Sequence, residues 1–121
     1  MREPFSIRAR LRSFRYAFSG LAVLLRETHN ARIHLAATLL VLGLAEYFNV
    51  SRQEWLVLLL AIGLVWLAEA LNSALEYLAD AAVPEQHELV RKSKDVAAAG
   101  VLIASFIAAV VGLSVFGPYF F

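Results

Sequence analysis

Three long apolar stretches dominate the chain, and they indicate three helices that cross a membrane. They occupy residues 31–50, 55–80 and 94–118. Each is near or above the ~20 residues that a helix needs to span the hydrocarbon core of a bilayer. Ser51 is the predicted N-cap of the second helix. Pro84 interrupts the chain between the second and the third.

Residues 1–29 show a different pattern, in which apolar and basic side chains interleave. The apolar positions recur at helical spacing, which predicts one stripe along a helix, made of Ile7, Leu11, Phe14, Phe18, Leu21 and Leu25. The arginines fall largely off this stripe. We therefore predict a surface helix in the membrane interface, its apolar side toward lipid and its arginines among the headgroups. The alternative is an amphipathic helix packed on a soluble core.

Composition supports the membrane interpretation. Of 121 residues, 60% are hydrophobic and 17% are charged, against ~45–50% and ~25% in soluble domains. This balance argues against a disordered chain and a small soluble domain. The absence of cysteine excludes a thiol nucleophile and thiolate metal sites. We expect one all-α domain over residues 1–121 and, with a net charge of +1, no nucleic-acid partner.

The distribution of basic residues predicts the orientation. Seven of the eleven lie in residues 1–32, one in the turn at 46–54, three in the loop at 80–95, and none after it. Because basic residues concentrate on the cytoplasmic side, we expect the N-terminus and the 80–95 loop to be cytoplasmic. Three spans then place the C-terminus outside.

The second apolar stretch carries an unusual set of polar side chains on one face. At 100° per residue they fall within an arc of about 100°, and they are Glu69, Asn72, Ser73, Glu76 and Asp80. An ionisable group near the centre of a membrane costs at least ~2.5–3.5 kcal/mol, so it is a functional candidate. A helix that projects into the cytoplasm would explain Asp80 and Glu76 as solvated residues, but it explains Glu69 poorly.

Stacked carboxylates beside a basic loop are typical of a metal–nucleotide site. Mg²⁺ takes one or two carboxylates together with substrate phosphates, and a second carboxylate can act as a general base. The loop and the residues after it supply further candidates, namely Glu85, Gln86, His87, Glu88, Arg91, Lys92, Lys94 and Asp95. Taken alone, the basic residues would be interpreted as headgroup anchors and His87 as a solvated loop residue.

Small residues recur every four positions in the third stretch, at Gly100, Ala104, Ala108 and Gly112. Such spacing lets membrane helices approach closely, although membrane helices are rich in these residues in any case. Because three spans enclose an active site poorly, we expect a homo-oligomer with sites between subunits.

The motif Glu69-Ala-Leu-Asn72-Ser73-Ala-Leu-Glu76, followed by Asp80, His87 and Lys94-Asp95, resembles the prokaryotic diacylglycerol kinase family. That family includes the undecaprenol kinases, and the resemblance covers most of the chain. The Asn30–His34 segment and Pro84-Glu85 are more similar to the undecaprenol kinase branch.

The resemblance implies a homotrimer in the bacterial plasma (inner) membrane that transfers the γ-phosphate of MgATP to a lipid alcohol, undecaprenol or diacylglycerol. By position, Glu69 would be the general base and Glu76 a Mg²⁺ ligand, supported by Asn72 and Ser73. The implied nucleotide contacts are Tyr16, Glu76, Asp80, Glu85, Gln86, His87, Lys94 and Asp95. The lipid would lie along the surface helix, with Phe14, Phe18 and Glu69.

The sequence departs from the family pattern at two positions. The second metal-binding Glu of the family matches Thr28, and Glu27 precedes it. A shift of one residue rotates a helical side chain by 100°, so either Glu27 or Thr28 with water is the second ligand. A nucleotide-contacting Arg of the family matches Ala9, between Arg8 and Arg10.

Two other functions fit the residues. The carboxylate face could line a proton or cation path in a non-enzymatic membrane protein. The shift at Thr28 could also indicate a catalytically weakened, kinase-like assembly subunit.

Overall fold

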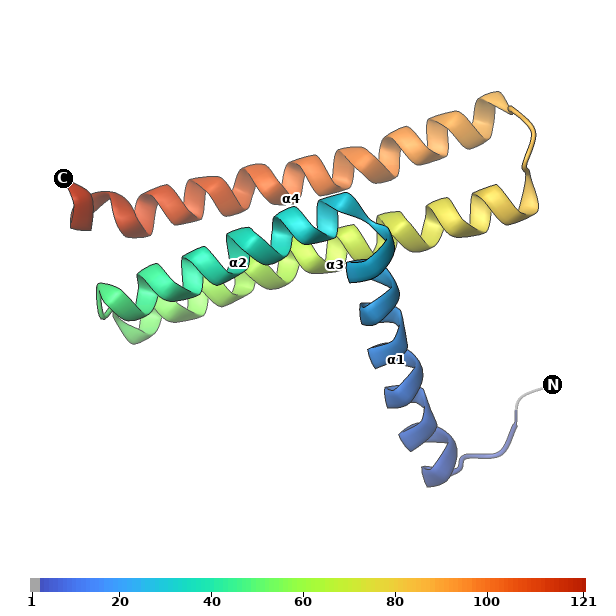
Figure 1. The fold of residues 1–121 in the computed structure, drawn as a ribbon, viewed down its shortest axis with the longest axis horizontal. Helices are drawn as coiled ribbons and strands as arrows, with labels where there is room; N and C mark the ends of the chain where they lie inside the picture. The colour runs from blue at the N-terminus through green and yellow to red at the C-terminus, as the bar shows by residue number, and fades with distance from the viewer. Residues whose placement is uncertain (1–2) are drawn as a thin grey trace.

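The computed structural model describes residues 3–121, which form four helices and, within that range, no strand. They are α1 (Ile7–Glu27), α2 (His29–Tyr47), α3 (Arg52–Ala82) and α4 (Glu88–Phe120). Helices α3 and α4 form a long antiparallel hairpin, α2 lies along α3, and α1 projects steeply away (Figure 1). The predicted all-α class is confirmed.

The turn between α2 and α3 is defined by local hydrogen bonds. Asn49 has a φ of 51°, which asparagine tolerates better than most residues. The Asn49 N–H donates to Glu46 O and the Val50 N–H to Ala45 O, each at 3.2 Å, which is the Schellman ending of a helix. Ser51 then caps α3, as predicted, in a reciprocal capping box with Glu54. Helix α2 therefore ends sharply and α3 begins at once.

The corner between α1 and α2 has no glycine and uses side chains instead. Thr28 is extended, and its hydroxyl donates to Leu24 O at 2.7 Å. The guanidinium of Arg32 donates to Leu25 O at 3.1 Å and to Arg26 O at 2.7 Å. These bonds satisfy carbonyls that the end of α1 leaves free. Arg32 therefore ties the surface helix to the start of α2.

The largest buried cluster lies at the end of the bundle that is remote from α1. It contains Ala45, Val50, Leu58, Val115 and Phe116. The ring of Phe48 packs on it and stacks on Tyr119 at a centroid distance of 5.2 Å. The Tyr119 hydroxyl donates to Glu54 at 2.8 Å. This cluster joins the end of α4 to the α2–α3 turn.

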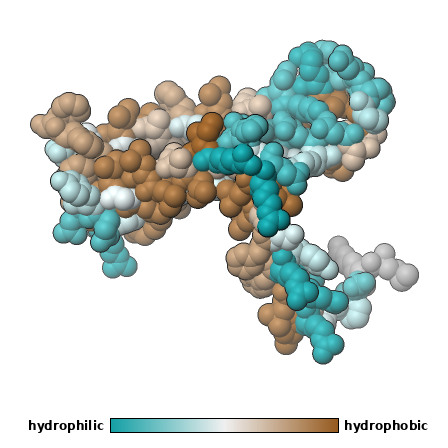
Figure 2. Space-filling view, in the orientation of Figure 1, coloured by the Kyte–Doolittle hydropathy of each residue, from teal (hydrophilic) through white to brown (hydrophobic). Residues whose placement is uncertain are grey.

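Most of the remaining apolar surface is not covered by protein. Helices α3 and α4 are each long and apolar enough to cross a membrane, yet only 33% and 11% of their most apolar windows are buried. Helices in the core of a soluble protein would be mostly covered. Figure 2 shows apolar side chains along the bundle between two polar ends. This pattern fits helices whose solvent is lipid.

The third predicted span, α2, is long enough at 19 residues but less apolar, and it does not count beside α3 and α4 as a candidate span. Its first turns carry His29, Asn30, Arg32 and His34, and Glu46 lies near its end. Its 19 residues would extend about 28 Å at 1.5 Å per residue, close to the ~30 Å of a hydrocarbon core. Its membrane crossing stays a prediction.

The first half of the surface-helix stripe is largely uncovered, since Ile7, Leu11, Phe14 and Phe18 are 63–70% exposed. Within residues 3–121, no soluble core lies behind this part of the helix, which contradicts the alternative considered for the sequence. The small residues of α4 do not all make close contacts either. Ala104 is buried, but a Cβ added at Gly100 or Gly112 would meet nothing within 4 Å.

Helix boundaries differ from those predicted mainly in the last helix. We expected a membrane helix over 94–118, with Lys94 at its start, but α4 begins at Glu88. Lys94 lies in the second turn. The physical reason is the cap, because the His87 ring accepts the Leu89 N–H at 3.1 Å and Glu88 places a negative charge in the first turn.

The capping box at Ser51 yields a test of the fold. Replacing Ser51 with Ala should lower the free energy of unfolding by about 1 kcal/mol, the usual cost of losing an N-cap. Detergent-titration unfolding measures it. Ser114→Ala on the exposed side of α4 is the matched control and should change stability by less than about 0.5 kcal/mol. Equal values for the two variants would contradict this role.

Candidate active site

Glu69 is the most deeply placed ionisable group of the chain's described part. It lies in α3 with 2% of its surface exposed. The Ser73 hydroxyl, one turn later, donates to its Oε1 at 3.3 Å. On the other side, Nε2 of His34 lies 3.4 Å from its Oε2. A carboxylate is stable at such a site only if neighbouring polar groups replace water.

His34 is the functional candidate that the sequence interpretation did not identify as a site residue. Its side chain is 15% exposed. Thr38, one turn later, donates to His34 O at 2.7 Å and accepts the indole N–H of Trp66 at 2.9 Å. The ring of Trp66 meets the imidazole edge-on at 6.2 Å. One feature of the sequence could have identified it. His34 is the sole ionisable residue between Arg32 and Glu46, within an otherwise apolar stretch.

Three buried polar atoms around this point have no hydrogen-bond partner in the described residues. They are Nε2 of His34, Oε2 of Glu69 and Oδ1 of Asn72. Leaving such an atom unpaired costs about 1–3 kcal/mol. Buried polar groups are nearly always paired in folded proteins, so unpaired atoms on neighbouring helices mark a point where these groups could bind one another or another molecule.

The predicted polar face of α3 is thus divided into two zones. Glu69, Asn72 and Ser73 are buried, whereas Glu76 and Asp80 are exposed. The division arises because the α3–α4 hairpin extends beyond the corner where α1 meets α2 (Figure 1). Glu69 lies within the bundle, and Asp80 lies on the projecting part.

The second zone is a polar cavity of about 530 Å³ at the projecting end. It brings together five of the predicted nucleotide contacts and Arg91, its lining including Asp80, Glu85, Gln86, His87, Arg91 and Lys94. Nζ of Lys94 lies 2.5 Å from Oδ1 of Asp80. This ion pair ties α4 to α3 and holds an ammonium group at the cavity.

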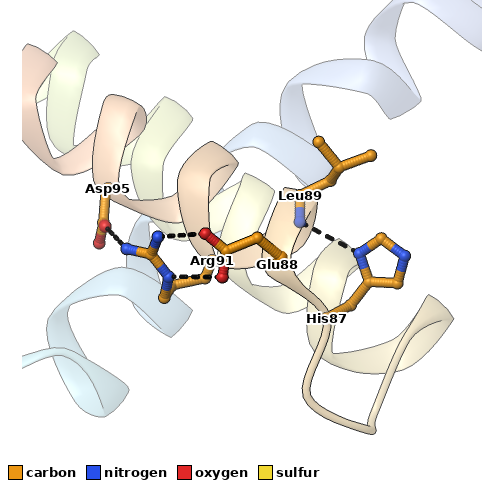
Figure 3. A network of polar contacts seen from close by, with 5 residues as sticks. All are labelled: His87, Glu88, Leu89, Arg91 and Asp95. Carbon is orange, nitrogen blue, oxygen red and sulfur yellow. Dashed lines mark hydrogen bonds and ion pairs between the residues drawn. The ribbon is translucent and has the colours of Figure 1, made fainter.

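A network of charges follows on the outer side of α4 (Figure 3). Arg91 pairs with Glu88 at 2.5 Å and with Asp95 at 2.9 Å. Asp95 therefore does not share a partner with its neighbour Lys94, since adjacent helical residues point 100° apart. His87 is also the N-cap of α4, a role that was not predicted from the sequence.

The predicted metal ligands come from the end of α1, the Thr28 corner and α3, and in the described residues they do not form a closed site. Glu27, at the end of α1, accepts the Tyr77 hydroxyl of α3 at 3.1 Å, and Tyr77 directly follows Glu76. The Thr28 hydroxyl instead donates to the backbone of α1. Across residues 3–121, no group of three His, Asp or Glu side chains is placed to hold a metal.

The predicted lipid contacts Phe14 and Phe18, and the predicted nucleotide contact Tyr16, are exposed on the projecting part of α1. The structure does not bring these three to the polar cavity, whose lining comes from α3, α4 and the loop between them. A separate apolar cavity of about 330 Å³ lies between α1 and α3. Its wall includes Ser73 and Tyr77, so it reaches the hydrogen-bond partner of Glu69.

Fold and site together define a helical membrane protein with a buried carboxylate, an apolar cavity that reaches its partner Ser73, and a polar cavity at the end of the hairpin. Residues 15–116 match the family described as prokaryotic diacylglycerol kinase. The chain belongs to this family, and its enzyme class is that of a lipid kinase.

Individual relatives agree with the family. The undecaprenol kinase of Bacillus subtilis is 33% identical over 107 residues, which cover 88% of this chain and 87% of that protein. The diacylglycerol kinase of Synechocystis is 38% identical over 101 residues, 83% of this chain and 58% of that protein. The diacylglycerol kinase of Escherichia coli K12 is 33% identical over 95 residues, 78% of each chain.

The pair between Asp80 and Lys94 is exposed enough to predict a small effect on stability. Their side chains are 66% and 35% exposed, and such pairs contribute about 0–1 kcal/mol. Asp80→Asn should therefore reduce the free energy of unfolding by less than about 1 kcal/mol, measured by detergent titration beside Glu85→Gln. A loss several times larger would show that the pair holds the hairpin together.

Proposed function

We propose that the protein transfers the γ-phosphate of ATP to the hydroxyl of a membrane lipid alcohol, with Glu69 as the general base. The observation that carries this proposal is the buried carboxylate of Glu69, with Oε2 unpaired. A base must reach the proton it removes, and a lipid hydroxyl lies naturally at the depth where the helices leave the hydrocarbon. Membership of a lipid kinase family favours this reaction over a proton or cation path.

The lipid and the nucleotide approach from different sides. The apolar cavity between α1 and α3 suits a lipid chain, and Ser73 in its wall contacts Glu69. The polar cavity at the end of the hairpin suits the nucleotide, with Lys94 positioned to offset phosphate charge. Phosphoryl transfer depends mainly on positioning and charge neutralisation. Glu69 accepts the hydroxyl proton as the lipid oxygen bonds to the γ-phosphorus, and the bond from that phosphorus to the bridging oxygen of ATP breaks to release ADP.

The carboxylates of Glu27 on α1 and Glu76 on α3 are suitable ligands for a Mg²⁺ ion that is also bound by the phosphates of ATP. Mg²⁺ is usually bound by one or two carboxylates plus substrate phosphates, so a cluster of three protein ligands is not required. Glu76 is exposed, and Glu27 faces the neighbouring Tyr77. This arrangement supports Glu27 over Thr28 as the second ligand. The metal would neutralise charge on the phosphates.

The remaining features of the proposal concern assembly and orientation. We propose a homotrimer in the bacterial inner membrane, with α2 as a third span, the N-terminus and the loop at 83–87 cytoplasmic, and the C-terminus outside. The uncovered apolar surface of α3 and α4 supports association with lipid and with other subunits. The position of the polar cavity at the loop suits a nucleotide that arrives from the cytoplasm.

The central test is Glu69→Gln, which keeps the size of the side chain and removes the base. We expect phosphate transfer from MgATP to lipid in mixed micelles to fall by about 10²- to 10⁴-fold, the usual contribution of a general base. Purified assembly size should be unchanged. Glu46→Gln, at an exposed carboxylate near the other end of α2, is the matched control. Near-normal turnover in Glu69→Gln would overturn the mechanism.

The relatives do not identify the lipid, since kinases of both substrates are similarly close. The Asn30–His34 segment favours undecaprenol. We therefore expect a higher kcat/KM for undecaprenol than for diacylglycerol when both are assayed side by side in the same micelles. A preference for diacylglycerol would contradict this part of the proposal and leave the role of Glu69 intact.

A further inference from the structure

We propose that His34 is a positioning residue for Glu69, donating a hydrogen bond from its Nε2–H to the carboxylate. This inference rests on the proposed function of Glu69 as a base. The two groups come from different helices, α2 and α3, and the facing atoms lie 3.4 Å apart. Both atoms are buried without another partner in the described residues. Each is therefore the available partner for the other.

The distance is slightly longer than the 2.7–3.2 Å of a good hydrogen bond. Hydrogen bonds of catalytic groups are often long before substrate binds and shorten in the reactive complex. A closure of a few tenths of an ångström would complete this one. Ser73 already donates to the other oxygen, Oε1. The two donors from two helices would then fix the plane of the carboxylate.

Thr38 and Trp66 restrict the position of His34. Thr38 donates to the backbone carbonyl of His34 and accepts from Trp66, whose ring edge borders the imidazole. Trp66 lies on α3, as Glu69 does, so this network fixes His34 to the helix that carries its partner. A cavity of about 250 Å³ is lined in part by His34 and Thr38.

A purely structural role for His34 would be packing α2 against α3. Packing makes no demand on a nitrogen donor at this position, whereas positioning of a carboxylate does. A neutral amide side chain at position 34 would therefore restore a positioning role, because it can donate a hydrogen bond. Gln retains an N–H donor at the end of a side chain of suitable length, whereas Leu fills the space without one.

The activity arm compares His34→Leu, His34→Gln and the control His29→Leu, at an exposed histidine of the same helix. We expect His34→Leu to lower kcat by about 10- to 100-fold, the effect of losing one hydrogen bond to a charged group, with KM for MgATP changed less than about twofold. His34→Gln should recover a substantial part of kcat. Unchanged kcat in His34→Leu, or no recovery in His34→Gln, would overturn the proposal.

The second arm does not depend on turnover or on either His34 variant folding. Protein with ¹⁵N-labelled histidine is examined by NMR in micelles, and the His34 signal is assigned by its loss in His34→Gln or, if that variant does not fold, by elimination with His29 and His87 variants. We expect its Nε2 resonance to move in Glu69→Gln and to stay in Glu46→Gln. An unmoved resonance would overturn the pairing. Full activity of Glu69→Gln would instead overturn the proposed function, which separates the two failures.

Discussion

The constraint on which the structure depends is that the chain cannot cover its own apolar surface. Four helices in a thin arrangement leave α3 and α4 largely uncovered, so the bilayer must act as their solvent. Water is absent there, and each polar group must lie at an end of the bundle or find a partner inside it. The capped turn at Ser51 and the His87 cap lie at the two ends, and the Arg32 side chain bonds to backbone carbonyls of α1 at the corner between them.

Glu69 is the exception, and our proposed function depends on it. Its carboxylate lies where neither water nor a strong ion pair surrounds it, and the contacts it has come from Ser73 on its own helix and His34 on the next. The apolar cavity beside α1 and the polar cavity at the loop are separate, and they share no lining residue. A reaction between a lipid and a phosphate donor needs that separation, because the two molecules are soluble in different media.

Much of this could be predicted from the chain because its signals are local. Helical periodicity, the Ser51 cap and the polar face of α3 each depend on residues within a few turns of one another. The depth of Glu69 was also predictable, since apolar residues precede and follow it. The polar residues at the start of α2 are visible in the sequence too, and the membrane crossing of this helix stays a prediction, since of the described helices α3 and α4 are the candidate spans.

The sequence by itself determined the class of protein, the four helices and the set of acidic residues, because composition and periodicity act along one chain. Only the tertiary structure decided which of those residues meet. It buried Glu69 in the bundle and left Asp80 exposed on the projecting part of the hairpin. It paired Lys94 with Asp80 and Asp95 with Arg91, and it placed His34 of α2 beside Glu69. These outcomes depend on how helices that are far apart in the sequence pack against one another. The pattern of residues within a single helix does not specify that packing.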